Sequence, residues 1–386
     1  MSGSQTLGQT AWGHVKALAD GIGPRPAGSE SERRAFDYVA AQLSQRGYRP
    51  ERMPVRFAPP PRFFALYALG GLALALGGWG VQHWPWAALA LPLVIVALPQ
   101  LARWLIPLRA RTAQSENLIA YAAASPDAPT LILCAHVDSA RASTFRHRAL
   151  LGLQSQTMFI ALRVALAVGA LAALRLLGFT LPAFLVWLVA ALGSLVGGWW
   201  ILTELLNQLG WQSAYSPGAH DNASGVGVVL ALAEHFAQTA PERLRLGFLF
   251  TGAEETGMHG AMAFAASLGQ ARQTRVLNFD MVGAGDTLCF AGGDGTLWPR
   301  RTDARLNALI QSAQPQVRRL WYTLRSGDFL PFLQRGLRAT SLQTSGSVPA
   351  EQAYHTVYDT MKVVEVSALE MTAQAAMKAV GQLARS

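Results

Sequence analysis

Histidines and carboxylates gather in short clusters along this chain of 386 residues. The clusters are Ala135-His136-Val137-Asp138, Asp221-Asn222-Ala223-Ser224-Gly225, Glu254-Glu255, Phe279-Asp280 and Tyr354-His355-Thr356. Imidazole and carboxylate ligands suit zinc, and a catalytic zinc site keeps one position open for water. Two zinc ions about 3.5–4 Å apart can share a bridging carboxylate and a bridging water, which lowers the pKa of that water. A glutamate beside a ligand glutamate can then serve as general base. These residue types indicate metal-dependent hydrolysis.

Three of the clusters come directly after apolar runs that are typical of buried β-strands. His136 follows residues 131–134, Glu254 follows residues 246–250, and Asp280 follows residues 276–277. Ligands bind at the carboxyl ends of the strands in a parallel α/β sheet, so we expect these side chains at one edge of the sheet. A Glu-Glu pair taken singly is more typical of a solvated surface, and Asp-Asn-x-Ser-Gly of a turn. The prediction therefore depends on the clusters occurring together.

The rest of the charged part of the chain alternates helix and strand signals. An amphipathic helix is expected to run to about Gln45, with Ser29 or Ser31 as its cap. Further strands are expected at residues 52–57, 117–122, 130–135, 244–251, 276–279 and 341–344, and helices at 226–236 and 363–383. This alternation predicts an α/β fold with a mixed, mainly parallel sheet sandwiched by helices.

Two long blocks carry almost no charge. The whole chain is 51% hydrophobic and 14% charged, whereas soluble domains carry about 25% charged residues. Residues 63–102 contain no charged side chain, and residues 149–203 contain only Arg163 and Arg175. Each block is long enough for two helices of about 20 residues, the length that crosses a bilayer. We therefore predict a transmembrane hairpin in residues 62–107 and another in 149–206, inserted into a peptidase domain of residues 1–61, 108–148 and 207–386.

The charges that flank the hairpins predict their orientation. The ends next to the globular domain carry Arg62, Arg103, Arg109, Arg111, Arg146 and Arg148, whereas the far loops hold only Arg175. Positive charge stays on the cytoplasmic side, so we expect a multi-pass protein of a bacterial-type inner membrane with its catalytic domain in the cytoplasm. Arg163 lies inside a span, where a charge costs about 2.5–3.5 kcal/mol, and would have to reach the interface or pair with Glu204.

Composition also argues against other classes. The net charge is +9, but the arginines are scattered and form no basic stripe, so we expect no nucleic-acid partner. Cys134 and Cys289 lie in apolar runs and are expected to pack as small hydrophobic residues without a disulfide. The opening residues are polar, so no signal peptide is expected. The oligomeric state stays open.

In their order along the chain, these motifs resemble the co-catalytic dizinc aminopeptidase family. That family includes leucyl aminopeptidase-like enzymes, glutamate carboxypeptidases and glutaminyl cyclases, and this chain would be a membrane-inserted variant. The resemblance is carried by Gly23-Pro24-Arg25-Pro26-Ala27-Gly28-Ser29, His136-x-Asp138, Asp221-Asn222-Ala223-Ser224-Gly225, Glu254-Glu255-Thr256-Gly257, Asp280-Met281-Val282-Gly283, Asp328-Phe329-Leu330-Pro331-Phe332 and Tyr354-His355-Thr356-x-x-Asp359.

The resemblance implies two Zn²⁺ ions. Asp221 would bridge them, His136 and Asp280 would complete one site, and Glu255 and His355 would complete the other.

The resemblance also implies roles for the neighbours of these ligands. Glu254 would be the general base, and Asp138 would accept the second ring N–H of His136. A cis peptide is implied at Asp221–Asn222. Tyr354 would either assist an oxyanion or pack beside His355, and Asp359 would support the site or cap a helix. The other histidines, His147, His235 and His259, match no motif and are expected on the surface or in helices.

Three positions depart from the family pattern and concern pocket shape. His220 stands where a small or amide residue is usual, Phe329 where histidine is common, and Ala261 where serine is frequent. The expected activity is removal of N-terminal residues from peptide substrates. The alternatives are a carboxypeptidase, a glutaminyl cyclase, or a non-catalytic membrane scaffold on the same fold.

Overall fold

The computed structural model describes residues 5–58, 64–105, 108, 110–125, 127–143, 148–209, 214–269, 273–295, 299–323 and 326–385. Two compact units make up the chain. One comprises Met1–Pro60, Ala110–Ala142 and Ala214–Ser386, and the other comprises Pro61–Arg109 and Ser143–Ser213. Their limits differ by a few residues from the domain boundaries that we expected. Four of the residues named above, Arg62, Arg109, Arg146 and His147, lie outside the described residues.

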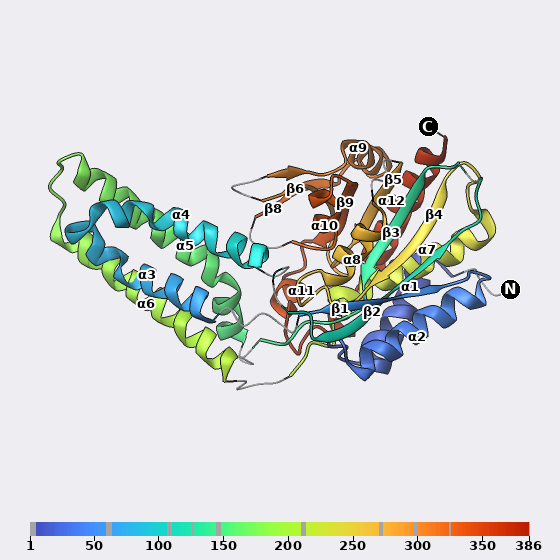
Figure 1. The fold of residues 1–386 in the computed structure, drawn as a ribbon, viewed down its shortest axis with the longest axis horizontal. Coiled ribbons are helices and arrows are strands. Elements are labelled where there is room, and N and C mark those ends of the chain that lie inside the picture. Colours follow the sequence, from blue (N-terminus) through green and yellow to red (C-terminus); the bar gives the residue numbers. More distant parts are fainter. Residues whose placement is uncertain are drawn as a thin grey trace. The chain divides into compact units, whose positions relative to one another are not determined.

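The first unit is built on a nine-stranded mixed sheet (Figure 1). Its strands are β1 (Glu51–Phe57), β2 (Ala113–Tyr121), β3 (Thr130–His136), β4 (Arg245–Thr251), β5 (Thr274–Phe279), β6 (Thr287–Asp294), β7 (Arg300–Arg301), β8 (Arg318–Tyr322) and β9 (Arg338–Ser345). They lie in the order β1-β2-β4-β3-β5-β9-β6-β7, with β8 also paired to β6. The central strands β4, β3, β5 and β9 run parallel, whereas β1, β2, β6 and β7 form antiparallel pairs at the two ends.

Helices cover both faces of this sheet, as predicted. The helical elements of the unit are α1 (Leu7–Lys16), η1 (Ala17–Ile22), α2 (Glu30–Gln45), η3 (Ala219–Ala223), α7 (Ser224–Thr239), α8 (His259–Ser267), α9 (Ala304–Ala313), α10 (Phe329–Gln334), α11 (Val348–Ala353), η4 (Met361–Val363) and α12 (Val366–Arg385). Strand β3 shows how the core is divided. Leu131 and Leu133 pack into the cluster that contains α1, α7 and α12, whereas Ile132 and Cys134 pack into the cluster with α8 and α10.

The longer apolar segments were predicted well, and the short ones were missed. Ser29 caps α2, where its Oγ accepts the N–H of Glu32 at 3.1 Å. Helix α1 was not expected, although Thr6 and Gln9 form a capping box at its start. Strands β6–β8 and helices α8–α11 were also missed, because they are mostly too short to show a clear periodic pattern. The two cysteines are buried and free, as expected.

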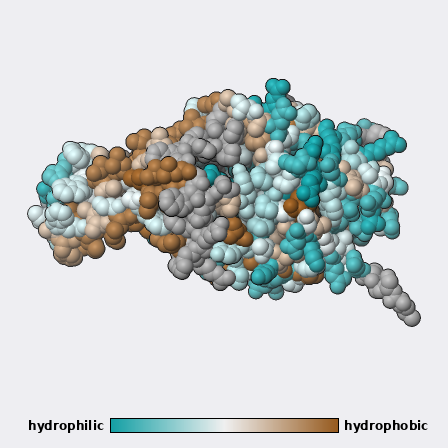
Figure 2. Space-filling view, turned by 90° about the horizontal axis from the view of Figure 1, so that it is seen from below, coloured by the Kyte–Doolittle hydropathy of each residue, from teal (hydrophilic) through white to brown (hydrophobic). Residues whose placement is uncertain are grey.

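The second unit contains two helical hairpins. Their helices are α3 (Phe64–His83), α4 (Pro85–Leu105), α5 (Arg148–Leu176) and α6 (Ala183–Gln208). Each contains a stretch that is long and apolar enough to cross a membrane, and only 33–39% of each stretch is buried in the structure. The rest presents large apolar side chains outward, and Figure 2 shows hydrophobic residues over much of this surface. An exposed apolar surface of this kind suits contact with lipid.

Helices α3 and α6 approach each other closely at glycines. A Cβ atom added at Gly197 would lie 2.2 Å from the carbonyl oxygen of Gly71, and one added at Gly78 would lie 2.2 Å from the Cα of Ala190. Small residues of this kind permit close helix contacts in membranes. Arg163 is exposed on α5, and no ion pair between described residues joins it to Glu204.

Candidate metal centre

The ends of three neighbouring strands bring two predicted ligands and the predicted base together. His136 is the last residue of β3, Asp280 directly follows β5, and Glu254 lies three residues beyond the end of β4. Because β3 pairs in parallel with both β4 and β5, all three side chains belong to the carboxyl edge of the sheet. This is the edge where the strand pattern predicted a site.

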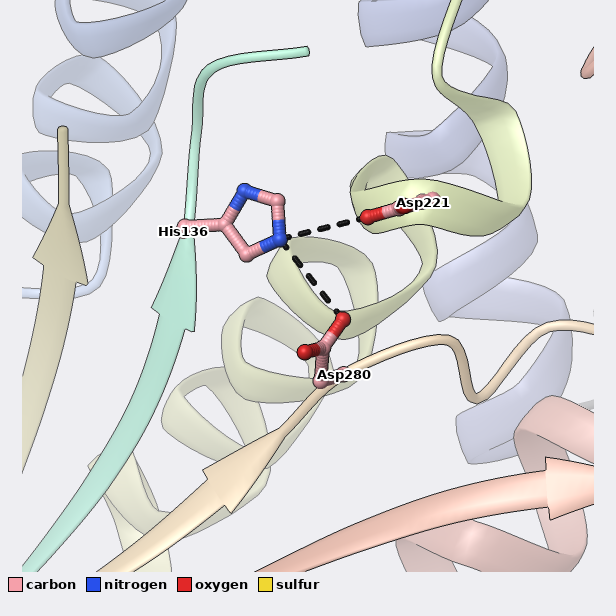
Figure 3. Close-up of side chains that lie close together, drawn as sticks. All are labelled: His136, Asp221 and Asp280. Carbon is pink, nitrogen blue, oxygen red and sulfur yellow. Dashed lines mark ion pairs between the residues drawn. The ribbon is translucent and has the colours of Figure 1, made fainter. Parts of the chain in front are cut away.

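Asp221 lies at the centre of the cluster. Its Oδ1 atom is 3.3 Å from Nε2 of His136, and its Oδ2 atom is 3.1 Å from Nε2 of His355. Asp280 approaches the same Nε2 of His136 with its Oδ1 at 3.6 Å, as Figure 3 shows. Glu255 approaches Nε2 of His355 with its Oε2 at 3.2 Å. The residues therefore form two sets of three that share the Asp221 carboxylate.

The donor set fits divalent cations. The ligand atoms of each set lie within 4.8 Å of one another. Of the described contacts, none gives the buried Oε1 atom of Glu255 a hydrogen-bond partner, and such an atom needs a partner or a cation. His136 donates from Nδ1 to the backbone carbonyl of Asp138 at 3.1 Å, so its Nε2 is the ring nitrogen that faces Asp221 and Asp280. Residues that could hold two cations are thus His136, Asp221, Glu255, Asp280 and His355.

Electrostatics in the cluster reflect an excess of buried carboxylates. Burial is the main cause that raises the pKa of Glu254 well above its ordinary value, and it also raises the pKa of Asp280 and Glu255. Burial alone would lower the pKa of His355, but Glu255 and Asp221 raise it to about 10. Burial opposes ionisation of Asp221, yet its hydrogen bonds to the two histidines lower its pKa. Protons partly neutralise these clustered carboxylates here. A bound divalent cation would neutralise them more strongly, because it carries two positive charges.

The turn that carries Asp221 is held by Asp359. The peptide bond Asp221–Asn222 is cis, as the resemblance implied. Asp359 accepts the N–H of His220 with Oδ1 at 2.7 Å and the N–H of Asp221 with Oδ2 at 3.0 Å. Asp359 is 1% exposed, so its carboxylate bonds to the turn and is shielded from water.

Asn222 and Ser224 of the Asp-Asn-x-Ser-Gly motif anchor the turn to the end of β5 and the residues after it. Asn222 donates to the carbonyl of Phe279 at 2.8 Å. Ser224 donates to the carbonyl of His220 at 2.6 Å and accepts the N–H of Val282 at 3.0 Å. The unusual His220 accepts the N–H of Gly283 through Nδ1 at 3.2 Å. Burial lowers the pKa of His220 to about 4, so it is a neutral structural residue at neutral pH.

Asp138 has a different partner from the one expected. Its carboxylate Oδ1 is 3.7 Å from the Nδ1 of His136, so the backbone carbonyl makes that hydrogen bond instead. The carboxylate accepts the N–H groups of Glu254 at 3.0 Å and Glu255 at 3.1 Å. The geometry of a carboxylate is well matched to two adjacent backbone donors. Asp138 therefore orients the turn after β4, which carries the predicted base.

The structure shows the surroundings of three further residues that the sequence had left open. Tyr354 stacks on His355 with ring centroids 3.8 Å apart, which supports its packing role. Phe329 is fully buried and packs edge-on against Tyr322. His259 begins α8, as a helix residue, but it is buried.

Two further buried carboxylates lie close to the end of β4, and sequence reasoning assigned no role to either. Glu32 accepts the N–H of Gly28 at 2.7 Å and the hydroxyl of Ser115 at 2.8 Å, and burial raises its pKa to about 8. Asp328 accepts the hydroxyl of Thr251, and burial raises its pKa to about 7. Their signals were position three of a capped helix for Glu32 and the Asp-Phe-Leu-Pro-Phe motif for Asp328.

The fold and this cluster together define a zinc exopeptidase-like α/β domain. Residues 207–380 match the model of Peptidase family M28. The resemblance drawn from the motifs is thereby confirmed.

Two curated proteins are similar to part of the chain. The vacuolar membrane protease of Clavispora lusitaniae is 28% identical over 158 residues, which is 40% of this chain and 15% of that protein. Aminopeptidase YwaD of Bacillus subtilis is 26% identical over 168 residues, which is 40% of this chain and 35% of that protein. The matched stretch thus spans well under half the length of either relative.

Solved structures share the fold over nearly the whole chain. The aminopeptidase from Aneurinibacillus sp. strain AM-1 aligns with a TM-score of 0.57 and 17% identity, covering 97% of this chain and 93% of that one. The glutaminyl cyclase of Porphyromonas gingivalis aligns with a TM-score of 0.54 and 14% identity, covering 98% and 99%. These likenesses confirm the predicted fold class.

Proposed function

We propose that this chain is a membrane-inserted, dizinc aminopeptidase that removes N-terminal residues from peptides. The observation that carries the proposal is the position of Asp221, whose two carboxylate oxygens each face a different histidine. A single cation would need only one of the two sets. Two sets that share one carboxylate support a pair of cations, with His136 and Asp280 at one and Glu255 and His355 at the other.

The residues of the chain divide the work of peptide hydrolysis. A pair of zinc ions supplies positive charge that acidifies a bound water and polarises a carbonyl group. Glu254, adjacent to the ligand Glu255, accepts the proton of the attacking water and returns it to the leaving amine. A raised pKa suits a group that must hold a proton between these two steps, and burial raises that of Glu254.

The charge of the cluster favours an N-terminal over a C-terminal substrate group. Among the described ion pairs, these carboxylates pair with His136 and His355 and with no lysine or arginine. The buried Arg25 is occupied by backbone carbonyls. A carboxypeptidase needs a cationic side chain for the substrate carboxylate, whereas an aminopeptidase needs none beside its metals.

A substrate panel separates the candidate reactions. The full chain, purified in detergent, would be incubated with peptides that are free, N-acetylated or C-amidated, with and without chelator. An aminopeptidase releases amino acids from free and C-amidated peptides but not from N-acetylated ones, and zinc restores activity after chelation. Cleavage that tolerates N-acetylation but not C-amidation would indicate a carboxypeptidase. Release of ammonia from an N-terminal glutamine peptide would indicate a cyclase, and no turnover with metal bound would indicate a scaffold.

We also propose that helices α3–α6 insert into a bacterial-type inner membrane with the peptidase domain in the cytoplasm. The apolar length of the four helices and the arginines that flank them in the sequence support this topology. Labelling of single cysteines placed at Thr180 and at Arg385 with a membrane-impermeant reagent in intact cells tests it. Labelling at Thr180 but not at Arg385 is expected, and the reverse pattern would contradict the orientation.

A further inference from the structure

Arg25 is fully buried, and its guanidinium donates hydrogen bonds to five backbone carbonyls. Its Nε donates to Val137 at 2.9 Å, its Nη1 to Pro217 at 2.8 Å, Gly23 at 2.9 Å and Leu18 at 3.3 Å, and its Nη2 to Gly218 at 2.9 Å. A planar guanidinium has five N–H groups in a fixed fork, so it can hold several chain segments at defined angles.

Three of the five carbonyls bound by Arg25 belong to segments next to the candidate ligands. Val137 directly follows His136, and Gly218 lies three residues before Asp221. Ser139 strengthens the same link, since its Oγ accepts the N–H of Arg25 at 2.9 Å and its own N–H donates to the carbonyl of Arg25 at 2.9 Å. Arg25 therefore connects the end of β3 to the turn that carries Asp221.

The turn is held by opposite charges on its two polar ends. Its carbonyl at Gly218 faces the Arg25 guanidinium, whereas its N–H groups at His220 and Asp221 face the Asp359 carboxylate. The positive guanidinium binds a carbonyl oxygen, and the negative carboxylate binds N–H groups, so each charge meets backbone atoms of opposite partial charge. The position of the Asp221 carboxylate thus depends on both sides of this clamp.

Gly218 shows how closely the clamp is packed. Its φ of +61° is rarely adopted by residues with a side chain, and an added Cβ would lie 2.5 Å from the carbonyl oxygen of Asp221 and 3.0 Å from Nη2 of Arg25. A substitution here would displace the same contact that Arg25 makes, without removing any charge.

We propose that Arg25 is a positioning residue that sets the separation of His136 and Asp221 and thereby the zinc affinity of the centre. The inference rests on the proposed metal site. Lysine cannot replace it, because one ammonium group with three donors cannot reach all of the carbonyls that the guanidinium binds. Burial lowers the pKa of Arg25 to about 10 while Asp359, Asp138 and other carboxylates oppose that shift, so the guanidinium stays charged at neutral pH.

The test compares zinc affinity and thermal stability in the full chain. Wild type, Arg25→Lys and Gly218→Ala would be titrated with zinc against a fluorescent chelator, and their unfolding temperatures measured without metal. The matched control is Arg275→Lys, because Arg275 is also buried and pairs with Asp303 at 3.0 Å, but on β5 at the end far from the ligands. We expect zinc affinity to fall about 10- to 100-fold in both test variants, as when partners of metal ligands are removed.

Each outcome bears on a different claim. A loss of zinc affinity in Arg25→Lys and Gly218→Ala, but not in Arg275→Lys, supports the inference, and saturating zinc should then restore much of the turnover. Lower unfolding temperatures with wild-type zinc affinity would mean that Arg25 is only structural and would overturn it. Fewer than two zinc ions in wild type would instead overturn the proposed dizinc centre, and this inference with it.

Discussion

Asp138 and Glu254 are joined by a hydrogen bond in which Oδ1 of Asp138 accepts the backbone N–H of Glu254 at 3.0 Å. The other carboxylate oxygen accepts the N–H of Glu255 at 3.1 Å. Asp138 is fully buried and lies two residues beyond the end of β3. A residue two positions after one candidate ligand thus positions the proposed base and another ligand.

Asp138→Asn should impair catalysis more than folding. An amide has one acceptor oxygen, so one of the two N–H groups would face an NH₂ group instead of a carboxylate oxygen. We expect a fall of about 10- to 100-fold in turnover, typical of lost support behind a metal site. Steady-state kinetics and zinc content would be compared with Asp37→Asn, which changes an exposed ion pair with Arg52. Equal kinetics in the two variants would exclude the positioning role.

Glu254→Gln should abolish proton transfer and leave the metals in place. The glutamine keeps the size of the side chain but cannot accept the proton of a water, so turnover should fall by at least about 10²- to 10⁴-fold. Elemental analysis of the same sample should still find the wild-type zinc content. The exposed Glu351→Gln serves as control. Full activity in Glu254→Gln would show that another group is the base.

Asp221 and Asp280 should differ in how many metals they hold. Among the described ion pairs, Asp221 pairs with both histidines, whereas Asp280 pairs with His136 and not with His355. We expect Asp221→Ala to lose most of both zinc ions and Asp280→Ala to retain about one, because the set of Asp221, Glu255 and His355 remains. Zinc per chain after gel filtration is the measurement. The same zinc content in the two variants would contradict a bridging role for Asp221.

His14 should make the protein less stable in mild acid. It is 8% exposed, its Nδ1 lies 2.7 Å from the hydroxyl of Tyr38, and burial, with Arg46 second, lowers its pKa from 6.5 to about 4. Because the folded protein binds this proton less readily than the unfolded chain, stability is full above pH 6.5 and falls as the pH drops towards 4. The loss is at most about 3 kcal/mol. In unfolding temperatures between pH 4 and 8, His14→Gln should show a smaller decrease than wild type. Parallel curves for the two proteins would exclude His14 as a source of the acid sensitivity.

Neighbouring glycines in α6 offer a test of hairpin packing. A Cβ at Gly197 would lie 2.2 Å from the Gly71 carbonyl oxygen, whereas a Cβ at Gly198 would meet nothing within 4 Å. Gly197→Ala should therefore destabilise the hairpins by about 1–3 kcal/mol, as overpacked sites do. Gly198→Ala should leave the unfolding temperature in detergent unchanged or slightly raised. The same effect from both variants would rule out close packing of α3 on α6.

Much of the fold followed from local sequence patterns. Buried strands such as β3 and β4 are continuous apolar runs, and the two hairpins are long uncharged blocks, so both could be recognised without tertiary information. The pattern of strand ends also indicated that His136, Glu254 and Asp280 would meet. Elements such as β8 and α11 were missed because short exposed segments take their structure from neighbours that pack against them.

The sequence by itself determined the chemistry of this protein, since the types of the ligand residues and their placement after apolar strands are local properties. Only the tertiary structure decided how those residues are held. Sequence spacing does not reveal three of these contacts. Asp138 binds the turn that carries Glu254, and Asp359 binds the turn that carries Asp221. Arg25 connects the segments of His136 and Asp221. Each of these contacts joins segments far apart in the chain, and a hydrogen bond forms only where folding brings donor and acceptor within about 3 Å.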